Sequence, residues 1–202
     1  NGALISEKTE WDPESNNSMY SISKYGAEME VWRATQEGLD AVIVQPGVII
    51  GSGHWNRGSG LIFNSVDKGI SFYTPGGVGI VDVKDVAKAM LQLMQSQVVN
   101  ESFVLVGENI YYREFLSEIA LNLHKKPPTK KIQKWVLLLV SSVDSFFALL
   151  LGKNQKLPKS TVRSLYKTAF YDSEKIGNAL NFSFVSSKET LARVAKDFLR
   201  KP

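Results

Sequence analysis

The stretch AVIVQPGVIIG, residues 41–51, decides how this chain folds. Its apolar residues follow one another without alternation and many are β-branched, which is typical of a strand buried on both faces of a parallel sheet. We therefore expect one strand over 41–50, whose ladder pairing weakens at Pro46, because proline has no N–H to donate. Predicted helices over 18–37 and 82–95 flank this strand and give the element order of an open α/β sheet.

Turn residues divide the rest of the chain into short elements. Residues 1–17 are polar and turn-rich, and 51–60 are rich in Gly and Ser, so both should be loops. Short strands and several helices should follow, and they are expected at 61–68 (helix), 72–74, 79–81 and 102–106 (strands), and 112–123, 130–151, 158–168, 172–180 and 186–200 (helices).

Composition sets broad limits on function. With 44% hydrophobic and 22% charged residues, the 202-residue chain should form a globular protein with a real core. The net charge of +4 comes from lysines in the second half, which favour a solvated face first, an anionic membrane surface second and nucleic acid last. The chain has no cysteine and two distant histidines, His54 and His124, so we expect no disulfide and no metal site. A cytoplasmic location fits this composition.

The apolar stretch 135–151 approaches the length of a membrane span. Asp144 and three serines lie at its centre, where a charge is costly in lipid, so we do not expect it to cross a bilayer. A helix buried on two sides is the favoured interpretation. A helix resting on a membrane surface, helped by the nearby lysines, is the alternative.

The chemistry of the chain is concentrated at Tyr20 and Lys24. Four residues apart at the start of a predicted helix, they lie on one face, one turn from each other. An ammonium beside a phenol favours the phenolate form, which suits proton transfer. Tyr171 and Lys175 repeat the spacing, so the spacing alone is a weak signal. However, Tyr20 and Lys24 lead directly into the strand predicted over 41–50, whose end is where an open α/β sheet binds its ligands.

Four segments resemble the extended short-chain dehydrogenase/reductases, which include NAD-dependent epimerases and dehydratases and dihydroflavonol-reductase-like and 3β-hydroxysteroid-dehydrogenase-like proteins. Residues 20–24 resemble the catalytic helix of that family. Residues 45–51 resemble its Arg-Pro-x-x-Val-Tyr-Gly segment, 81–87 its Val-Asp-Val-x-Asp-Val-Ala element, and 171–180 its late Asp-x-x-Lys element. The four occur in the family's order and together cover most of the chain.

The resemblance implies the fold. Residues 1–51 and 80–108 would form the C-terminal part of a Rossmann-type parallel sheet, the second half of a dinucleotide-binding domain. Residues 52–79 and 109–202 would form a mostly helical substrate-binding lobe.

The resemblance also implies a role for each matched residue. Tyr20 would be the general acid/base toward a substrate hydroxyl or carbonyl, and Lys24 would hold the nicotinamide ribose hydroxyls of NAD or NADP. The backbone of Pro46, Gly47 and Val48 would meet the nicotinamide carboxamide. His54 and Arg57, just past this strand, lie where the substrate pocket of the family forms.

The chain departs from the family in four ways. Gln45 stands where an Arg is usual, and Ile50 stands where an aromatic residue is usual. The Gly-x-x-Gly-x-x-Gly turn that seats the pyrophosphate at a helix N-terminus is absent from the sequence. For the hydroxyl that positions the substrate upstream of Tyr20, Ser6 and Thr9 are the sole candidates. We therefore expect this chain to be the C-terminal portion of a longer enzyme and to be inactive alone.

The sequence thus predicts an NAD(P)-dependent oxidoreductase or epimerase/dehydratase that acts on an alcohol, a carbonyl compound or a nucleotide sugar. Trp135, Phe146 and Phe147 favour a terpenoid- or steroid-like alcohol, provided that they line an apolar pocket. The alternatives are a non-catalytic dinucleotide-sensing or membrane-associated protein of the same fold, and an interaction domain in which the Tyr20–Lys24 pair is accidental. A homodimer and a membrane contact through 135–151 are left open.

Overall fold

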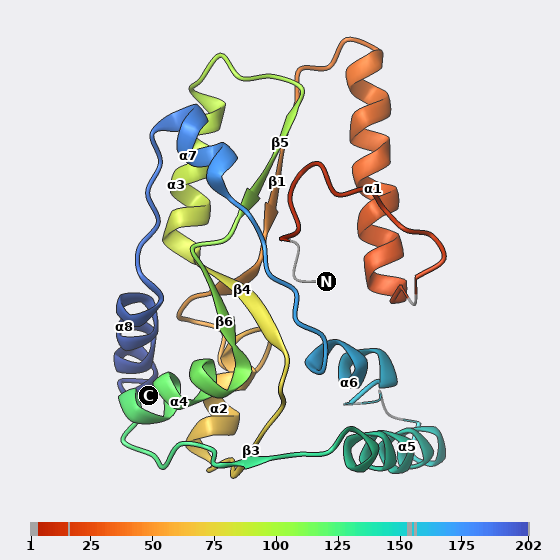
Figure 1. Cartoon of the computed structure of the whole chain (residues 1–202), viewed down its shortest axis with the longest axis vertical. Helices are drawn as coiled ribbons and strands as arrows, with labels where there is room; N and C mark the ends of the chain where they lie inside the picture. Colours follow the sequence, from red (N-terminus) through yellow and green to blue (C-terminus); the bar gives the residue numbers. More distant parts are fainter. Residues whose placement is uncertain (1–3, 16, 153–154, 156, 202) are drawn as a thin grey trace.

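The computed structural model describes residues 4–15, 17–152, 155 and 157–201, and Figure 1 shows how their helices and strands are arranged. In chain order these elements are α1 (Met19–Gln36), β1 (Val42–Pro46), β2 (Val48–Ile50), α2 (Gly60–Asp67), β3 (Phe72–Tyr73), β4 (Gly77–Asp82), α3 (Val83–Met94), β5 (Glu101–Leu105), β6 (Glu108–Tyr111), α4 (Tyr112–Asn122), β7 (Lys130–Lys131), α5 (Lys134–Leu150), α6 (Lys159–Leu165), α7 (Glu174–Leu180) and α8 (Ser187–Leu199). The protein is a mixed α/β structure with parallel strand pairs, as the sequence predicts.

The first helix, α1, begins and ends where the sequence predicts. The hydroxyl of Ser18 accepts a hydrogen bond from the backbone N–H of Ser21 at 3.0 Å, which caps the helix. Gly38 follows the C-terminal end with φ +98°, a left-handed conformation that favours glycine. Thr35 is the buried residue of this helix, and α1 stands beside the sheet at the right of Figure 1.

The stretch 41–51 forms two strands, so the prediction of one strand over 41–50 is wrong. β1 pairs in parallel with β5, whereas β2 pairs in parallel with β4, and β4 continues the sheet through antiparallel pairing with β6. The chain changes partner at Gly47. A Cβ placed there would lie 2.5 Å from the carbonyl oxygen of Gly79, so the backbone of β4 passes too close for any side chain.

The predicted burial on both faces is also wrong for β1. Residues 42–45 are half-buried, and Pro46 is exposed. β1 has β5 on one side, and among the described residues no strand pairs with its other edge. An apolar strand is therefore left partly open.

Two apolar clusters make up the core. One cluster lies around β2, β4 and β6 under α2, α4 and α8, and its largest buried side chains are Ile50, Phe63, Phe115, Ile119, Leu191 and Phe198. The other cluster packs α3 and α7 against β5, and it includes Val81, Leu93, Phe103, Leu105 and Ile176.

The helical part differs from expectation at several points. Lys130 and Lys131 form the short strand β7, which pairs with β3, so the helix predicted over 130–151 begins at Lys134. The strand β6 was not predicted, and β4 is longer than the expected 79–81. Across the described parts of the chain, no helix has both the length and the apolar character that crossing a bilayer requires.

Candidate active site

Tyr20 and Lys24 lie in the first two turns of α1, and both are exposed, Tyr20 by 75%. The start of α1 lies toward the carboxyl end of β1, as Figure 1 shows. This is the end at which parallel α/β sheets bind their ligands. Among the described residues, Lys24 has no ion-pair partner.

A groove of about 750 Å³ separates the start of α1 from α6. Tyr20 lines it, and most of the other lining side chains are polar or basic: Asn17, Ser18, Ser21, Ser160, Thr161, Arg163, Ser164 and Lys167. The groove can therefore accommodate a polar ligand, and its two basic residues suit a ligand that carries negative charge.

Sequence reasoning missed the contribution of α6 to this groove. Pro158 precedes a short basic segment in which Ser160, Thr161 and Ser164 supply hydroxyls. That local composition was the available signal, but nothing in the sequence placed the segment opposite Tyr20.

His54 and Arg57 lie elsewhere. Both are exposed on the loop between β2 and α2, where an Arg57 guanidinium nitrogen lies 3.3 Å from the His54 Nδ1. Neither residue lines the groove beside Tyr20.

The aromatic residues expected to line an apolar substrate pocket do not do so. Trp135, Phe146 and Phe147 are more than half exposed on α5, and none of them lines the groove beside Tyr20. A nearly all-apolar cavity of about 250 Å³ does exist near α4, and α5 contributes Leu137 to it. The aromatic residues therefore give no support for a steroid-like substrate.

At the end of β1 one residue is exposed and the next is fixed by a backbone hydrogen bond. Pro46 is exposed and offers no N–H, and the N–H of Gly47 donates to the carbonyl of Leu105 at 3.0 Å. Val48 is half-buried, and its side chain packs against the core.

Gln45 has a defined partner on α1. Its side-chain amide donates to the Glu28 carboxylate at 2.9 Å, and the indole N–H of Trp32 donates to the same oxygen at 3.3 Å. The residue that replaces the usual Arg therefore still links β1 to the helix that carries Tyr20.

The second Tyr-x-x-x-Lys segment is structural. The ammonium of Lys175 donates to the carbonyl of Ser102 at 2.8 Å and forms an ion pair with Glu101, which ties the start of α7 to β5. Burial raises the pKa of Tyr171, which makes proton loss harder at neutral pH.

Ser6 and Thr9 occupy a turn in the N-terminal segment. The backbone N–H of Ser6 donates to the Thr9 hydroxyl at 2.9 Å, and neighbouring Ile5 forms a bridge with Tyr171. Neither hydroxyl lines the groove beside Tyr20. Among the described residues no cluster of His, Asp or Glu could hold a metal ion.

Asp82 and Asp85, two buried carboxylates at the start of α3, accept hydrogen bonds from different elements. Asp82 caps the helix by accepting from the N–H of Lys84 at 2.9 Å, and it also accepts from Thr190 and Arg193 of α8. Asp85 instead accepts from the N–H of Val185 at 2.8 Å, which fixes the segment before α8.

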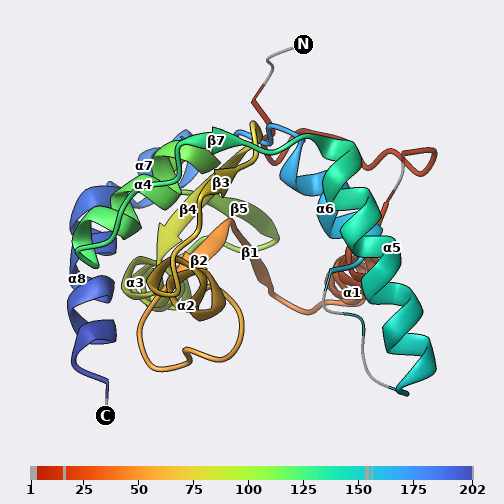
Figure 2. The ribbon, with the colours of Figure 1, turned by 90° about the horizontal axis from the view of Figure 1, so that it is seen from below.

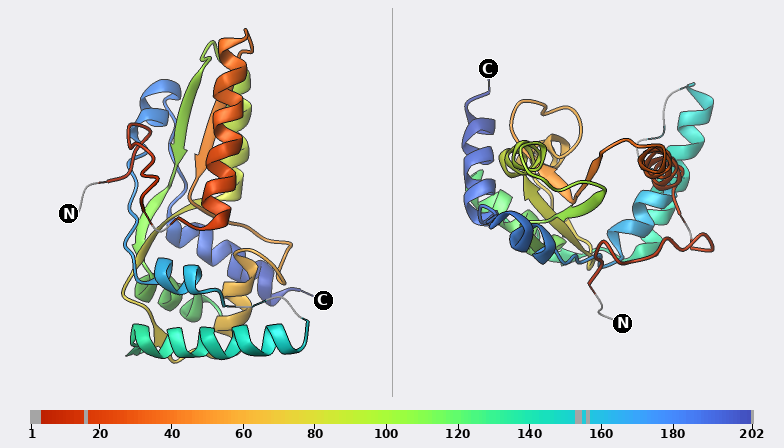
Figure 3. Two further views of the ribbon diagram at one scale, coloured as in Figure 1. Left: turned by 90° about the vertical axis from the view of Figure 1, so that its right-hand side faces the viewer. Right: turned by 90° about the horizontal axis from the view of Figure 1, so that it is seen from above.

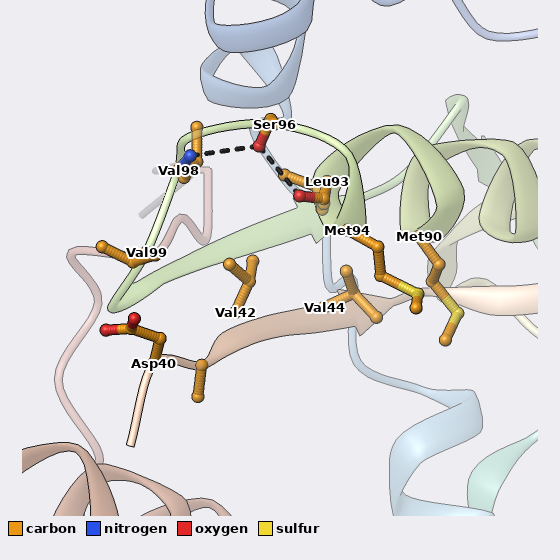
Figure 4. Close-up of a pocket in the computed structure, with 10 residues that line it drawn as sticks. Asp40, Val42, Val44, Met90, Leu93, Met94, Ser96, Val98 and Val99 are labelled. Atoms are coloured by element: carbon orange, nitrogen blue, oxygen red, sulfur yellow. Dashed lines mark hydrogen bonds between the residues drawn. The ribbon is translucent and has the colours of Figure 1, made fainter. Parts of the chain in front are cut away.

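An apolar hollow of about 300 Å³ lies beside β1, between this strand and α3 (Figure 4). Val42 and Val44 face Met90 and Met94 across it, and Asp40 lies at one end. The hollow lines the same strand that has an unpaired edge, so this region presents both free backbone groups and apolar side chains.

The chain is similar to proteins of known class. A family model described as "NAD dependent epimerase/dehydratase family" matches residues 2–107, slightly more than half of the chain. A putative dihydroflavonol 4-reductase from Synechocystis is 27% identical over 181 residues, which are 86% of this chain and 52% of that protein. The chain thus spans about half the length of this curated relative.

Two solved structures share the fold. A nucleoside-diphosphate-sugar epimerase from Pseudomonas aeruginosa superposes with a TM-score of 0.78 at 19% identity, over 98% of this chain and 61% of that one. The dTDP-glucose 4,6-dehydratase DesIV from Streptomyces venezuelae, crystallised with NAD and TYD, gives a TM-score of 0.69 at 19% identity, over 100% of this chain and 56% of its own.

Proposed function

Because this chain belongs to the NAD-dependent epimerase/dehydratase family, we propose that it carries the acid/base part of an NAD(P)-dependent oxidoreductase or epimerase/dehydratase. One observation carries the proposal: the exposed residues Tyr20 and Lys24 lie in the first two turns of α1, toward the carboxyl end of β1, and Tyr20 lines a polar groove. Tyr20 exchanges a proton with a substrate oxygen, and Lys24 lies one turn further along the same face of α1.

The residues present fit a nicotinamide nucleotide. Lys24 has no ion-pair partner among the described residues, and its ammonium can bind ribose hydroxyls. Pro46 is exposed at the end of β1, and the side chain of Val48 turns into the core, so the backbone between them is open to the carboxamide. When bound, the nicotinamide supplies or accepts the hydride.

The groove favours a polar, anionic substrate over a steroid-like alcohol. Ser160, Thr161 and Ser164 offer hydroxyls, and Arg163 and Lys167 add positive charge. A nucleotide sugar has both the hydroxyls and the phosphate charge that such a lining binds.

We also propose that further chain completes the sheet at the open edge of β1. That edge has no strand beside it among the described residues, and the hollow next to it is apolar. The chain covers 52% of the Synechocystis relative. The pyrophosphate cradle would belong to that further part, and this chain alone is expected to be inactive. The cytoplasmic location and a homodimer stay predictions.

The test compares Tyr20→Phe with Tyr171→Phe in the full-length protein. Each variant removes one hydroxyl from a Tyr-x-x-x-Lys segment, so Tyr171→Phe is a matched control. We expect Tyr20→Phe to lower turnover by 100-fold or more, roughly the contribution of a general acid/base, while nicotinamide-nucleotide binding measured by calorimetry persists. Tyr171→Phe should keep full turnover.

Equal turnover of Tyr20→Phe and the unmodified protein would exclude Tyr20 as the acid/base. Lys24→Met extends the test, since it should weaken nucleotide binding as well as turnover. Its matched control, Lys175→Met, removes the lysine that bonds β5 and should lower stability and leave nucleotide affinity unchanged.

A further inference from the structure

The helix α5 presents an unbroken apolar face to solvent. At about 100° per residue, its exposed large side chains fall within an arc of about 140°, and no polar residue lies in that arc. Those exposed side chains are Trp135, Leu139, Val140, Val143, Phe146, Phe147 and Leu150. Single exposed apolar side chains are common on protein surfaces and need no explanation. A contiguous apolar patch of this kind marks an interaction site.

Two polar residues of α5, Ser141 and Asp144, contact the segment that precedes α6. Ser141 is fully buried, and its carbonyl accepts from the side-chain amide of Gln155 at 3.2 Å. Asp144 accepts from the backbone N–H of Leu157 at 2.8 Å. The sole acidic residue of the helix is therefore held against the protein and does not interrupt the exposed face.

The segment around α5 is strongly basic. Residues 126–171 contain nine lysines and arginines and a single acidic residue, Asp144, so this segment carries +8. The chain as a whole carries +4, and the remainder is therefore at −4. Lys130, Lys131 and Lys134 precede the apolar face directly, and among the described residues none of them has an ion-pair partner.

The position of α5 leaves its apolar face accessible. Figures 1 and 3 show α5 lying across one end of the molecule, roughly perpendicular to the strands, with α6 between it and α1. Figure 2, which views the molecule from that end, shows α5 in front. The groove beside Tyr20 lies on the α1 side of α6, so a partner on the exposed face of α5 would not block it.

We propose that α5 lies flat on an anionic lipid surface, with its apolar face in the boundary between headgroups and acyl chains. The helix has 17 residues and is about 25 Å long, less than the ~30 Å of a hydrocarbon core. An amphipathic helix with apolar aromatic residues on one face and nearby lysines has the composition of an interfacial helix. The lysines add attraction to anionic headgroups.

A second copy of this chain fits the same face poorly. A symmetric dimer through α5 would bring two +8 segments together, and like charges placed opposite each other oppose association. An anionic lipid surface suits both features of this segment, because its acyl chains can contact the apolar face and its headgroups can bind the lysines.

The experiment measures binding of the full-length protein to sucrose-loaded vesicles by co-sedimentation. Vesicles of phosphatidylcholine with phosphatidylglycerol are compared with phosphatidylcholine alone, at low and high salt. We expect preferential binding to the anionic vesicles that weakens as salt screens the charges. Phe146→Ser/Phe147→Ser should weaken it at least about tenfold, since two aromatic side chains are lost from the lipid boundary. Lys130→Gln/Lys131→Gln/Lys134→Gln should weaken it about fivefold per lysine.

Matched controls make the same changes elsewhere on the surface. Leu121→Ser/Leu199→Ser removes two exposed leucines of α4 and α8, and Lys84→Gln/Lys188→Gln/Lys196→Gln removes three exposed lysines. Both controls should bind vesicles like the unmodified protein.

Three results would overturn the proposal. The first is absence of binding to anionic vesicles at low salt, which would show that other chain or another partner covers the face. The second is unchanged binding by Phe146→Ser/Phe147→Ser. The third is conversion of a dimer into a monomer by this variant, seen by sedimentation velocity, without any vesicle binding by the unmodified protein.

Discussion

Replacing Asp82 by Asn should destabilise the protein, because three elements meet at this carboxylate. Asp82 is 3% exposed at the end of β4. It accepts from the N–H of Lys84 in α3 and from Thr190 at 3.0 Å, and it forms an ion pair with Arg193. The Asn side chain keeps one acceptor oxygen for the cap but loses the charge that faces Arg193. We expect a loss of about 2–3 kcal/mol in the free energy of unfolding, because a buried charged hydrogen bond is lost and Arg193 is partly solvated.

The effect should depend on pH with a definite sign. Burial acts to raise the pKa of Asp82, but the hydrogen bonds from Lys84, Arg193 and Thr190 and the charge of Arg193 outweigh it and hold the pKa below its ordinary value of 3.8. The stabilisation by ionised Asp82 is therefore fully present above the unfolded pKa, and it is lost as the pH falls through the lower folded pKa. The difference between the unmodified protein and Asp82→Asn should stay constant down to about pH 4–5 and shrink below that.

Asp85, three residues away, provides a control, because ionisation of its carboxyl group should affect stability in the opposite direction. It too is 3% exposed, but burial raises its pKa, the hydrogen bond from Val185 does not outweigh burial, and the charge of Asp82 raises the pKa further. Ionised Asp85 therefore costs stability above its folded pKa, and that cost is relieved as the pH falls. Asn can still accept from Val185, so Asp85→Asn should be neutral or stabilising at pH 7.

The assay is urea unfolding of each variant, followed by tryptophan fluorescence at neutral pH and through the acidic range. An equal loss of stability in Asp85→Asn and Asp82→Asn at pH 7 would refute the assignment of opposite roles. A difference between Asp82→Asn and the unmodified protein that persists unchanged well below pH 3.8 would refute the linkage argument.

Two further substitutions test how the site is held. Gln45→Arg should form an ion pair with Glu28 and stabilise the docking of α1 by up to about 1 kcal/mol, measured by urea unfolding, and Glu28→Gln should abolish that gain. Gly47→Ala should lower the free energy of unfolding by about 3 kcal/mol or prevent folding, because the added Cβ would lie 2.5 Å from the Gly79 carbonyl oxygen. Gly26→Ala, in α1 with open space around it, should instead raise the free energy of unfolding by about 0.5–1 kcal/mol.

The elements that the sequence predicts well are those with local signals. Ser18 and Gly38 mark the ends of α1 by side-chain capping and a left-handed conformation, and both are visible in a few residues. Residues 81–87 likewise open α3 at the expected Asp82. The order of such segments was enough to identify the family, because each segment is a short unit whose chemistry does not depend on distant chain.

The strand pairing could not be predicted, because it depends on distant residues. Nothing within 41–51 reveals that Gly47 passes against Gly79, and this contact is what divides the run into β1 and β2. The strands β6 and β7 are four and two residues long. Their conformation follows from their partners β4 and β3 and not from their own composition.

The same dependence on distant chain decides what an apolar helix does. The composition of α5 is compatible with burial on two sides, with a membrane surface and with a substrate pocket, and the sequence does not choose among them. In the structure α6 covers one side, where Ser141 is fully buried, whereas Trp135 and Phe146 on the other side remain more than 60% exposed. The single neighbouring helix α6 therefore buries one side of α5 and leaves the other side exposed. The basic residues are concentrated in residues 126–171, which include α5 and α6, while the rest of the chain is acidic. The exposed side of α5 is therefore also the side most suited to an anionic surface. Because α6 separates the exposed side of α5 from the groove beside Tyr20, α5 can meet lipid while the groove holds a polar substrate, without either ligand displacing the other.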